Sequence, residues 1–250
     1  MARLYTQLPH ELACRLKLVM ADVDGTLTDS GNDIDEKVIE AVRLIEERNI
    51  PVGLVSGRTV RMLEEVACIL SCHGPIIAEN GGAAKLKPGD TLIDLGYSRK
   101  PALDTLARLK EAFPGRIKER YDNSERLIDI VFRPEGVTIE DLYRVAGETQ
   151  MLDSGYICHL MQKGISKGNT LLRILSNTCK GVISREDVLV IGDSLTDLSL
   201  FQMFPHSVLI PNYRMDEYTK SLLLDSASYV SSSQAGEGFA ETAFHILEVI

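Results

Sequence analysis

The chain has 250 residues, of which 44% are hydrophobic and 25% are charged, so it can bury a substantial core in one large or two modest domains. Its formal net charge of −9 argues against a nucleic-acid partner, because a basic stripe usually binds such partners. No apolar stretch approaches the roughly 20 residues that span a bilayer, and the N-terminal segment lacks the apolar core of a signal peptide. We therefore expect a cytoplasmic protein that binds neither membranes nor nucleic acid.

The five cysteines are odd in number and scattered along the chain, which does not indicate a disulfide framework. Cys68, Cys72 and His73 lie close together, but no second pair of residues with zinc-ligand spacing accompanies them. We interpret them as the end of a helix and the start of a loop.

Apolar runs and helical patterns alternate in the first third and in the last third of the chain. The apolar runs predict strands at 17–21, 51–55, 75–79, 187–192 and 207–211. Apolar residues at helical spacing predict helices at 35–49, 59–70, 167–179, 195–204 and about 237–250. Near-continuous apolar strands that alternate with helices are typical of a parallel sheet covered on both faces. The predicted fold class is α/β, with a doubly wound parallel sheet.

The stretch between about 83 and 162 breaks this alternation. Partial alternation predicts strands at 91–95, 127–132 and 155–161, separated by helices at about 100–113 and 138–148. Such a composition favours a small α+β insertion, with one open sheet and its helices on one side. We therefore predict a core domain at 1–82 and 163–250 and an inserted domain at 83–162.

Unusual polar residues follow four of the predicted strands. They are Asp22 and Asp24, then Ser56, Gly57 and Arg58, then Asn80 within 79–82, and finally Asp193 and Asp197. In an open α/β sheet, ligands bind at the carboxyl ends of the strands. Each group alone is compatible with a helix cap or a turn, but all four together indicate one shared site.

The residue types at this edge indicate the chemistry of the site. Several acids that face one point repel one another unless a hard cation lies among them, and oxygen ligands without His or Cys suit Mg²⁺. Ser56 and the backbone N–H groups of the turns at Thr26 and Gly57 can bind a phosphate. Lys167 begins a predicted helix, where its charge opposes the helix dipole. These features favour a small phosphorylated metabolite as the substrate.

Four ordered motifs resemble those of the haloacid dehalogenase superfamily of phosphohydrolases. They are "DVDGT" (22–26), "LVSGR" (54–58), Lys167 before Gly168, and "GDSLTD" (192–197). The resemblance implies a Rossmann-like core. The insertion after "ENGG" (79–82) is similar to the subgroup with a large α+β cap, the Cof-type or class IIB members. Within it, the segment 153–168 most resembles phosphoglycolate phosphatases of the archaeal type.

The resemblance also implies roles for the residues of the motifs. Asp22 would attack phosphorus to form an aspartyl-phosphate, and Asp24 would protonate the leaving alcohol and then activate water. The two side chains lie two residues apart on an extended segment, so both can face one phosphate. The residues expected to bind the phosphoryl group are Thr26, Ser56, Gly57 and Lys167.

The metal ligands follow from the same resemblance. Mg²⁺ would be bound by Asp22, the backbone carbonyl of Asp24, and Asp193, with Asp197 orienting the site. Arg58 and Asn80 would contact the substrate or support the residues that do. Thr196 and Leu200 depart from the subgroup, which usually has Asn and Met there; we expect them to tune activity rather than abolish it.

Other functions are compatible with parts of the pattern. A sugar-phosphate mutase of the same superfamily would need an arginine-rich cap, and 83–162 carries Arg99, Arg108, Arg116, Arg120, Arg126 and Arg133. A phospho-accepting receiver module also combines acids, a hydroxyl and a lysine, but it lacks a long insertion and its acids are usually adjacent. A non-catalytic binding protein is disfavoured by the complete set of acids. His159 is expected to be packed rather than catalytic. We expect the protein to be a monomer or a homodimer.

Overall fold

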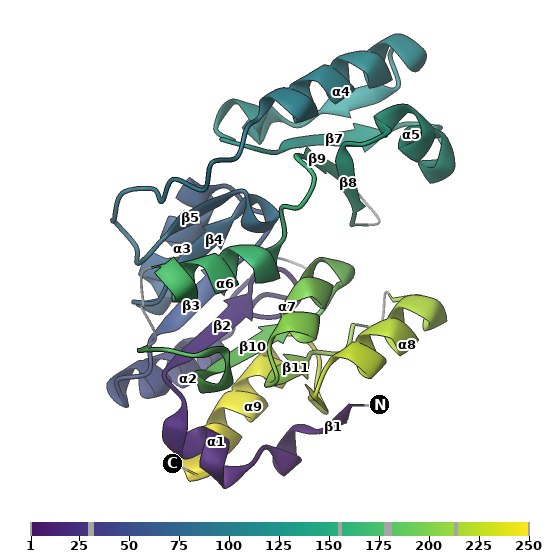
Figure 1. Cartoon of the computed structure of the whole chain (residues 1–250). Helices are drawn as coiled ribbons and strands as arrows, with labels where there is room; N and C mark the ends of the chain where they lie inside the picture. The colour runs from purple at the N-terminus through teal and green to yellow at the C-terminus, as the bar shows by residue number, and fades with distance from the viewer. Residues whose placement is uncertain (1, 30–32, 155–156, 178–181, 213–214, 250) are drawn as a thin grey trace.

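The computed structural model describes residues 2–29, 33–154, 157–177, 182–212 and 215–249. These residues form an eight-stranded sheet and a four-stranded sheet, which occupy the lower and upper parts of Figure 1. The predicted fold class, an α/β core with an α+β insertion, is confirmed.

The eight-stranded sheet is parallel except at one edge. In spatial order its strands are β1 (Arg3–Leu4), β12 (Tyr229–Val230), β11 (Ser207–Leu209), β10 (Val188–Gly192), β2 (Leu18–Asp22), β3 (Val52–Val55), β4 (Ile76–Ala78) and β5 (Ala83–Lys85). Only β5 runs antiparallel to its neighbour. The carboxyl ends of β2, β3, β4 and β10 therefore meet at the same edge of the sheet.

Helices cover both faces of this sheet, as predicted. The helices on one face are α1 (His10–Arg15), α2 (Glu36–Glu47), α3 (Val60–Leu70) and α9 (Ala235–Val249); those on the other are α6 (Lys167–Asn177), α7 (Leu198–Met203) and α8 (Glu217–Ser226). Alternate residues of β2 serve the two cores: Val19 and Ala21 pack in the first, and Leu18 and Met20 in the second. A strand buried on both faces has to be apolar throughout, which explains the unbroken run before Asp22.

The four-stranded sheet, which we call the cap sheet, is antiparallel. Its order is β6 (Ile117–Glu119), β7 (Ile130–Pro134), β9 (Cys158–Met161) and β8 (Gln150–Asp153). Helices α4 (Lys100–Ala112) and α5 (Ile139–Ala146) pack on one side of it (Figure 1). Their apolar residues share a separate core with Phe132 and Leu160 of the sheet.

The strand expected at 91–95 is wrong. These residues form no regular structure, and β5 takes the place beside β4 instead. A single backbone hydrogen bond joins Ile93 to Ala84 (2.9 Å), and Leu95 is buried in the core on the α6 side. An extended connection that buries apolar side chains shows the same partial alternation as a strand.

Other boundaries differ in smaller ways. The strand expected at 127–132 begins only at Ile130, and the predicted parts at 155–156 and 178–179 lie outside the described residues. Elements with short or weak patterns were not predicted: β1, β5, β6, β8, β12, α1 and α8. The domain boundaries at 82/83 and 162/163 stay a prediction.

The segment 67–73 ends a helix and begins a loop, as we interpreted it, because α3 ends at Leu70. Cys14, Cys68, Cys72 and Cys158 are free thiols, whereas Cys179 lies outside the described residues. Within the described ranges, none of the helices has the length and apolar character that crossing a membrane requires.

Candidate functional site

A cavity of about 970 Å³ lies at the carboxyl edge of the large sheet and is lined from the cap side as well. Most of the residues predicted for the site line it: Asp22, Asp24, Ser56, Gly57, Arg58, Asn80, Lys167 and Asp193. Thr26 and Asp197 are fully buried behind this lining. The four strand-end groups, up to 171 residues apart in the sequence, therefore come together at one cavity.

Lys167 joins two of the acids at the floor of the cavity. Its Nζ donates to Asp22 Oδ1 and to Asp197 Oδ1, each at 2.7 Å, and only 1% of the residue is exposed. Burial lowers the pKa of Lys167, but the two carboxylates more than offset this and hold it above its ordinary value. The lysine is therefore a fixed positive charge beside the Asp22 carboxylate.

Asp193 completes a cluster of carboxylates with Asp22 and Asp197, whose oxygens lie within 4.8 Å of one another. Asp193 Oδ2 accepts a hydrogen bond from Asn212 Nδ2 (2.8 Å). Burial and then the charge of Asp197 raise the pKa of Asp193 to about 7. Oxygen donors at this spacing could hold a metal ion, which would remove the penalty for ionising Asp193.

Burial is also the largest influence on Asp22, and it raises the pKa of that carboxyl well above the ordinary value. The Lys167 ammonium opposes this rise, whereas the neighbouring acids, Asp197 first, add to it. A cation among these oxygens would lower the pKa of Asp22 instead of raising it. The donor set thus fits a bound divalent metal, since all its atoms are oxygens and its charge is compensated only in part by Lys167.

Gly25 allows the first motif to pass close to Asp193. Its φ is +86°, and a Cβ at this position would lie 2.3 Å from Asp193 Oδ2. Both the left-handed conformation and the lack of space require glycine. The Gly of "DVDGT" is therefore explained by its approach to the acid of "GDSLTD".

Asp197 orients the loop that carries Asp193. Its Oδ2 accepts from the backbone N–H groups of Asp193 (3.2 Å) and Ser194 (3.1 Å), while its Oδ1 is engaged by Lys167. Thr196 contacts Ser194 through the hydroxyl groups, 2.9 Å apart, and Leu200 is buried in the core. Thr196 and Leu200, which differ from the usual residues of the subgroup, therefore both have packing or hydrogen-bond partners here.

Asp24 lies at the mouth of the cavity with about half of its side chain exposed, at 49%. Arg58 contacts it with Nε at 3.1 Å and with Nη2 at 2.5 Å. Ser56 Oγ donates to Asp24 Oδ2 at 3.2 Å and accepts from the N–H of Arg58 at 3.2 Å. The second motif is thus tied to the second acid of the first motif through an arginine and a hydroxyl group.

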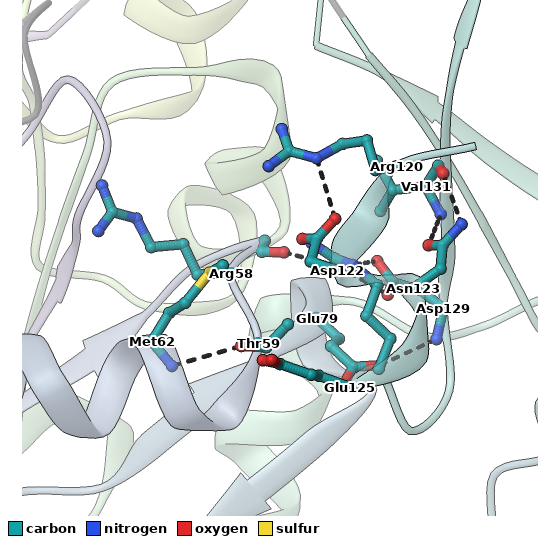
Figure 2. Close-up of polar contacts among 12 residues, drawn as sticks. Arg58, Thr59, Met62, Glu79, Arg120, Asp122, Asn123, Glu125, Asp129 and Val131 are labelled. Carbon is teal, nitrogen blue, oxygen red and sulfur yellow. Dashed lines mark hydrogen bonds and ion pairs between the residues drawn. The ribbon is translucent and has the colours of Figure 1, made fainter. Parts of the chain in front are cut away.

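Several charged residues on the cap side of the cavity were not predicted as site residues, and Figure 2 labels Asp122 and Asp129 among them. Arg126 Nη1 contacts Asp129 Oδ1 at 2.7 Å, and its Nη2 contacts Asp122 Oδ2 at 2.8 Å. Asp129 Oδ2 in turn lies 2.7 Å from His159 Nδ1. Asp122, Arg126, Asp129 and His159 each have under a tenth of their surface exposed. Buried charged residues that cluster in this way indicate a functional site, but the sequence does not show that they are buried. His159 is packed, as expected, yet it also lines the cavity.

Glu79 joins the large sheet to the cap. It follows β4 with a φ of +53°, and its carboxylate accepts the N–H groups of Leu127 (2.8 Å), Ile128 (2.8 Å) and Asp129 (3.0 Å). These N–H groups are not available for strand pairing, which explains why β7 begins only at Ile130. Burial, and then the charge of Asp129, raise the pKa of Glu79.

The chain matches a known family and named relatives over most of its length. The model of the family described as haloacid dehalogenase-like hydrolase matches residues 19–130 and 137–241. Phosphoglycolate phosphatase 1 of Saccharolobus solfataricus is 30% identical over 240 residues, 93% of this chain and 96% of the relative. Phosphoglycolate phosphatase of Methanothermobacter thermautotrophicus is 27% identical over 226 residues, 90% of this chain and 96% of the relative.

Solved structures share the fold. Thermoplasma acidophilum 0175 superposes with a TM-score of 0.77 at 24% identity, covering 94% of this chain and 99% of that chain. The sucrose-phosphatase of Synechocystis gives 0.71 at 18% identity, with coverage of 93% and 98%. At these identities the structures establish the architecture, and the sequence match establishes the family. The chain therefore belongs to the haloacid dehalogenase-like hydrolases.

Proposed function

We propose that this protein is a magnesium-dependent phosphatase that hydrolyses a small phosphomonoester such as phosphoglycolate through an aspartyl-phosphate. In this proposal 1–82 and 163–250 form the catalytic core and 83–162 form the cap. The observation that carries it is the buried Asp22 carboxylate at the cavity floor, held 2.7 Å from Lys167 within the cluster that contains Asp193. Two relatives at 27% and 30% identity are named phosphoglycolate phosphatases, which supports the substrate.

The chemistry takes two steps at phosphorus. An Asp22 oxygen forms a bond to phosphorus as the bond to the ester oxygen breaks, and Asp24 gives its proton to the departing alcohol. A water molecule then loses a proton to Asp24 and attacks phosphorus, which releases inorganic phosphate and frees Asp22. Ser56 and Lys167 stabilise the charge on the transferring oxygens throughout.

Asp22 and Asp193 are the side chains that would hold Mg²⁺, with the backbone carbonyl of Asp24 as the third protein ligand. Both carboxylate oxygens of Asp197 are already engaged by Lys167 and by backbone N–H groups, so Asp197 supports the site. When bound, the ion would neutralise charge on the phosphoryl group. Thr26 is fully buried behind the lining of the cavity, and its Oγ1 has no hydrogen-bond partner among the described residues, so its role toward the phosphoryl group stays a prediction.

The mutase alternative finds less support. Among the seven arginines of 83–162, Arg120 and Arg126 line the cavity, and both are paired with Asp122. Arg144, which is exposed, pairs with Asp141. The others donate to backbone oxygens or pair with an acid: Arg99 with Asn123, Arg108 with Ala146, Arg116 with Gly136 and Arg133 with Glu135. A second phosphate would have to displace these partners. Family membership removes the support for a receiver module or a non-catalytic binding protein.

A phosphate-release screen tests the proposal. The purified protein is assayed with phosphoglycolate, hexose phosphates, sucrose phosphate and mannosyl-phosphoglycerate, each with Mg²⁺ and with EDTA. We expect Mg²⁺-dependent release that is fastest with phosphoglycolate. Transfer of phosphate to a second sugar instead of water would favour the mutase, and equal rates in EDTA would contradict the metal requirement.

A further inference from the structure

Two side-chain nitrogens at the cavity, one after β4 of the large sheet and one on β9 of the cap sheet, have no hydrogen bond to protein among the described residues. They are Nδ2 of Asn80 and Nε2 of His159, whose Nδ1 is engaged by Asp129. Both residues line the cavity, although only 2% of Asn80 and 5% of His159 are exposed. A buried donor such as Asn80 Nδ2 is normally satisfied, so an acceptor from outside the protein is its missing partner.

Both side chains approach the same residue, Gly57. A Cβ on Gly57 would lie 3.1 Å from Asn80 Nδ2 and 3.1 Å from His159 Cε1. Gly57 directly follows Ser56, the hydroxyl of the phosphoryl site, and consecutive Cα atoms are only about 3.8 Å apart. An acceptor held by Asn80 and His159 therefore lies within the reach of a very short substrate whose phosphate contacts Ser56.

The position of His159 is fixed from behind. Asp129 contacts the ring at 2.7 Å and also contacts Arg126, and Arg126 Nη1 donates to the carbonyl oxygen of Gly57 at 3.0 Å. Glu79 holds the N–H of Asp129 (Figure 2). The histidine is thus oriented by a charged network that connects the cap to the loop of the second motif.

We propose that His159, with Asn80 beside it, binds a carboxylate of the substrate, and that the substrate class is a phosphorylated acid with its carboxylate one or two carbons from the ester oxygen. This inference rests on the proposed phosphatase function and adds its specificity. A carboxylate only accepts hydrogen bonds, which suits two nitrogen donors. Nδ1 faces the Asp129 carboxylate, so the ring donates from Nε2 to the carboxylate of the substrate when it carries both protons.

Steady-state kinetics with two matched esters test the assignment. The substrates are phosphoglycolate and 2-hydroxyethyl phosphate, which has the same two carbons without the carboxylate. The variant His159→Asn places an amide nitrogen where Nδ1 lies, so it keeps the contact to Asp129 and removes Nε2. The variant His159→Gln instead keeps a nitrogen near the position of Nε2. Thermal unfolding is measured for both to confirm that they fold.

We expect His159→Asn to raise KM for phosphoglycolate about thirtyfold, the effect of losing a hydrogen bond to a charged group, with kcat within about threefold. KM for 2-hydroxyethyl phosphate should change less than about twofold, and His159→Gln should restore part of the preference. Equal KM values of the native protein for the two esters, or equal effects of the variant on both, would overturn the carboxylate site and leave the phosphatase proposal standing. No release from any phosphomonoester would overturn both.

Discussion

Lys167 is buried between two carboxylates. Its positive charge lies at a position in the sequence, the start of a helix, where a positive charge is unfavourable. It begins α6, where a positive charge opposes the helix dipole, and Nζ lies 2.7 Å from both Asp22 and Asp197. Removal of one partner from a buried ion pair leaves an uncompensated buried charge, which costs several kcal/mol. An exposed ion pair contributes about 1 kcal/mol or less. Lys167 therefore has a structural role in the metal-free protein as well as its proposed role toward phosphate.

Lys167→Met should lower the free energy of unfolding in EDTA by about 3 kcal/mol and reduce kcat by at least about a hundredfold. Denaturant titration and phosphate release measure the two effects. Lys163→Met is the control, since Lys163 and its partner Glu148 are exposed and the change should stay within about 0.5 kcal/mol. A Lys167→Met protein with native activity would show that the lysine does not contact the phosphoryl group.

Gly25 and Gly89 offer a matched pair of substitutions, because both have positive φ, +86° and +82°. Alanine at either site introduces a similar backbone strain of about 1 kcal/mol. A Cβ meets nothing within 4 Å at Gly89, whereas at Gly25 it lies 2.3 Å from Asp193 Oδ2. We expect Gly25→Ala to raise the Mg²⁺ concentration that gives half-maximal activity at least tenfold. Gly89→Ala should leave that concentration unchanged. Equal Mg²⁺ titrations for the two variants would contradict the close approach.

At the scale of elements, Asp187 fixes the start of β10, the strand that ends at the "GDSLTD" motif. Its carboxylate accepts from the backbone N–H and the hydroxyl of Ser184 at 3.0 and 2.8 Å and from Arg15 Nη2 of α1 at 2.9 Å. Burial opposes ionisation, but these hydrogen bonds and the charge of Lys17 outweigh it and hold the pKa of Asp187 well below its ordinary value. Helix α1 and β10 are thereby joined through one side chain.

A lowered carboxyl pKa stabilises the folded state above the unfolded value, about 3.9 for Asp, and the effect is lost as pH falls through the folded value. Asp187→Asn should therefore lower the free energy of unfolding by about 1–2 kcal/mol at pH 7 and by progressively less below about pH 4. Denaturant titrations at pH 7 and pH 3 measure the difference. Asp104→Asn, an exposed control paired with Lys100, should show little effect at either pH; a deficit of Asp187→Asn that grows in acid would contradict the assignment.

Elements with a long, strong apolar period could be predicted from the sequence. The central strands β2, β3, β4 and β10 and the helices α2, α3, α6, α7 and α9 were found to within a few residues, because burial on both faces leaves an unmistakable pattern. The two-residue strands β1 and β12 carry no such pattern. The segment 91–95 was wrong because its apolar side chains are buried without strand pairing.

At the scale of the whole molecule, the large sheet and the cap sheet enclose the cavity from two sides. The rim of the large sheet could be predicted, since parallel strands bring their carboxyl ends to one edge whatever loops follow. Asn212, which follows β11, obeys the same rule and could have been added to the prediction. The cap side could not: the contact of Asp129 with His159 depends on the pairing of β7 with β9, and the place of His159 and Arg126 at the cavity depends on how the two sheets face each other. No local pattern encodes either arrangement.

Acid quenching during turnover tests the proposed covalent role of Asp22. The protein is mixed with phosphoglycolate and Mg²⁺, quenched within one turnover, digested and analysed by mass spectrometry. We expect one added phosphoryl group on the peptide that contains Asp22, and no phosphate release above background from a folded Asp22→Asn variant. Native kcat in Asp22→Asn would show that Asp22 is not the nucleophile.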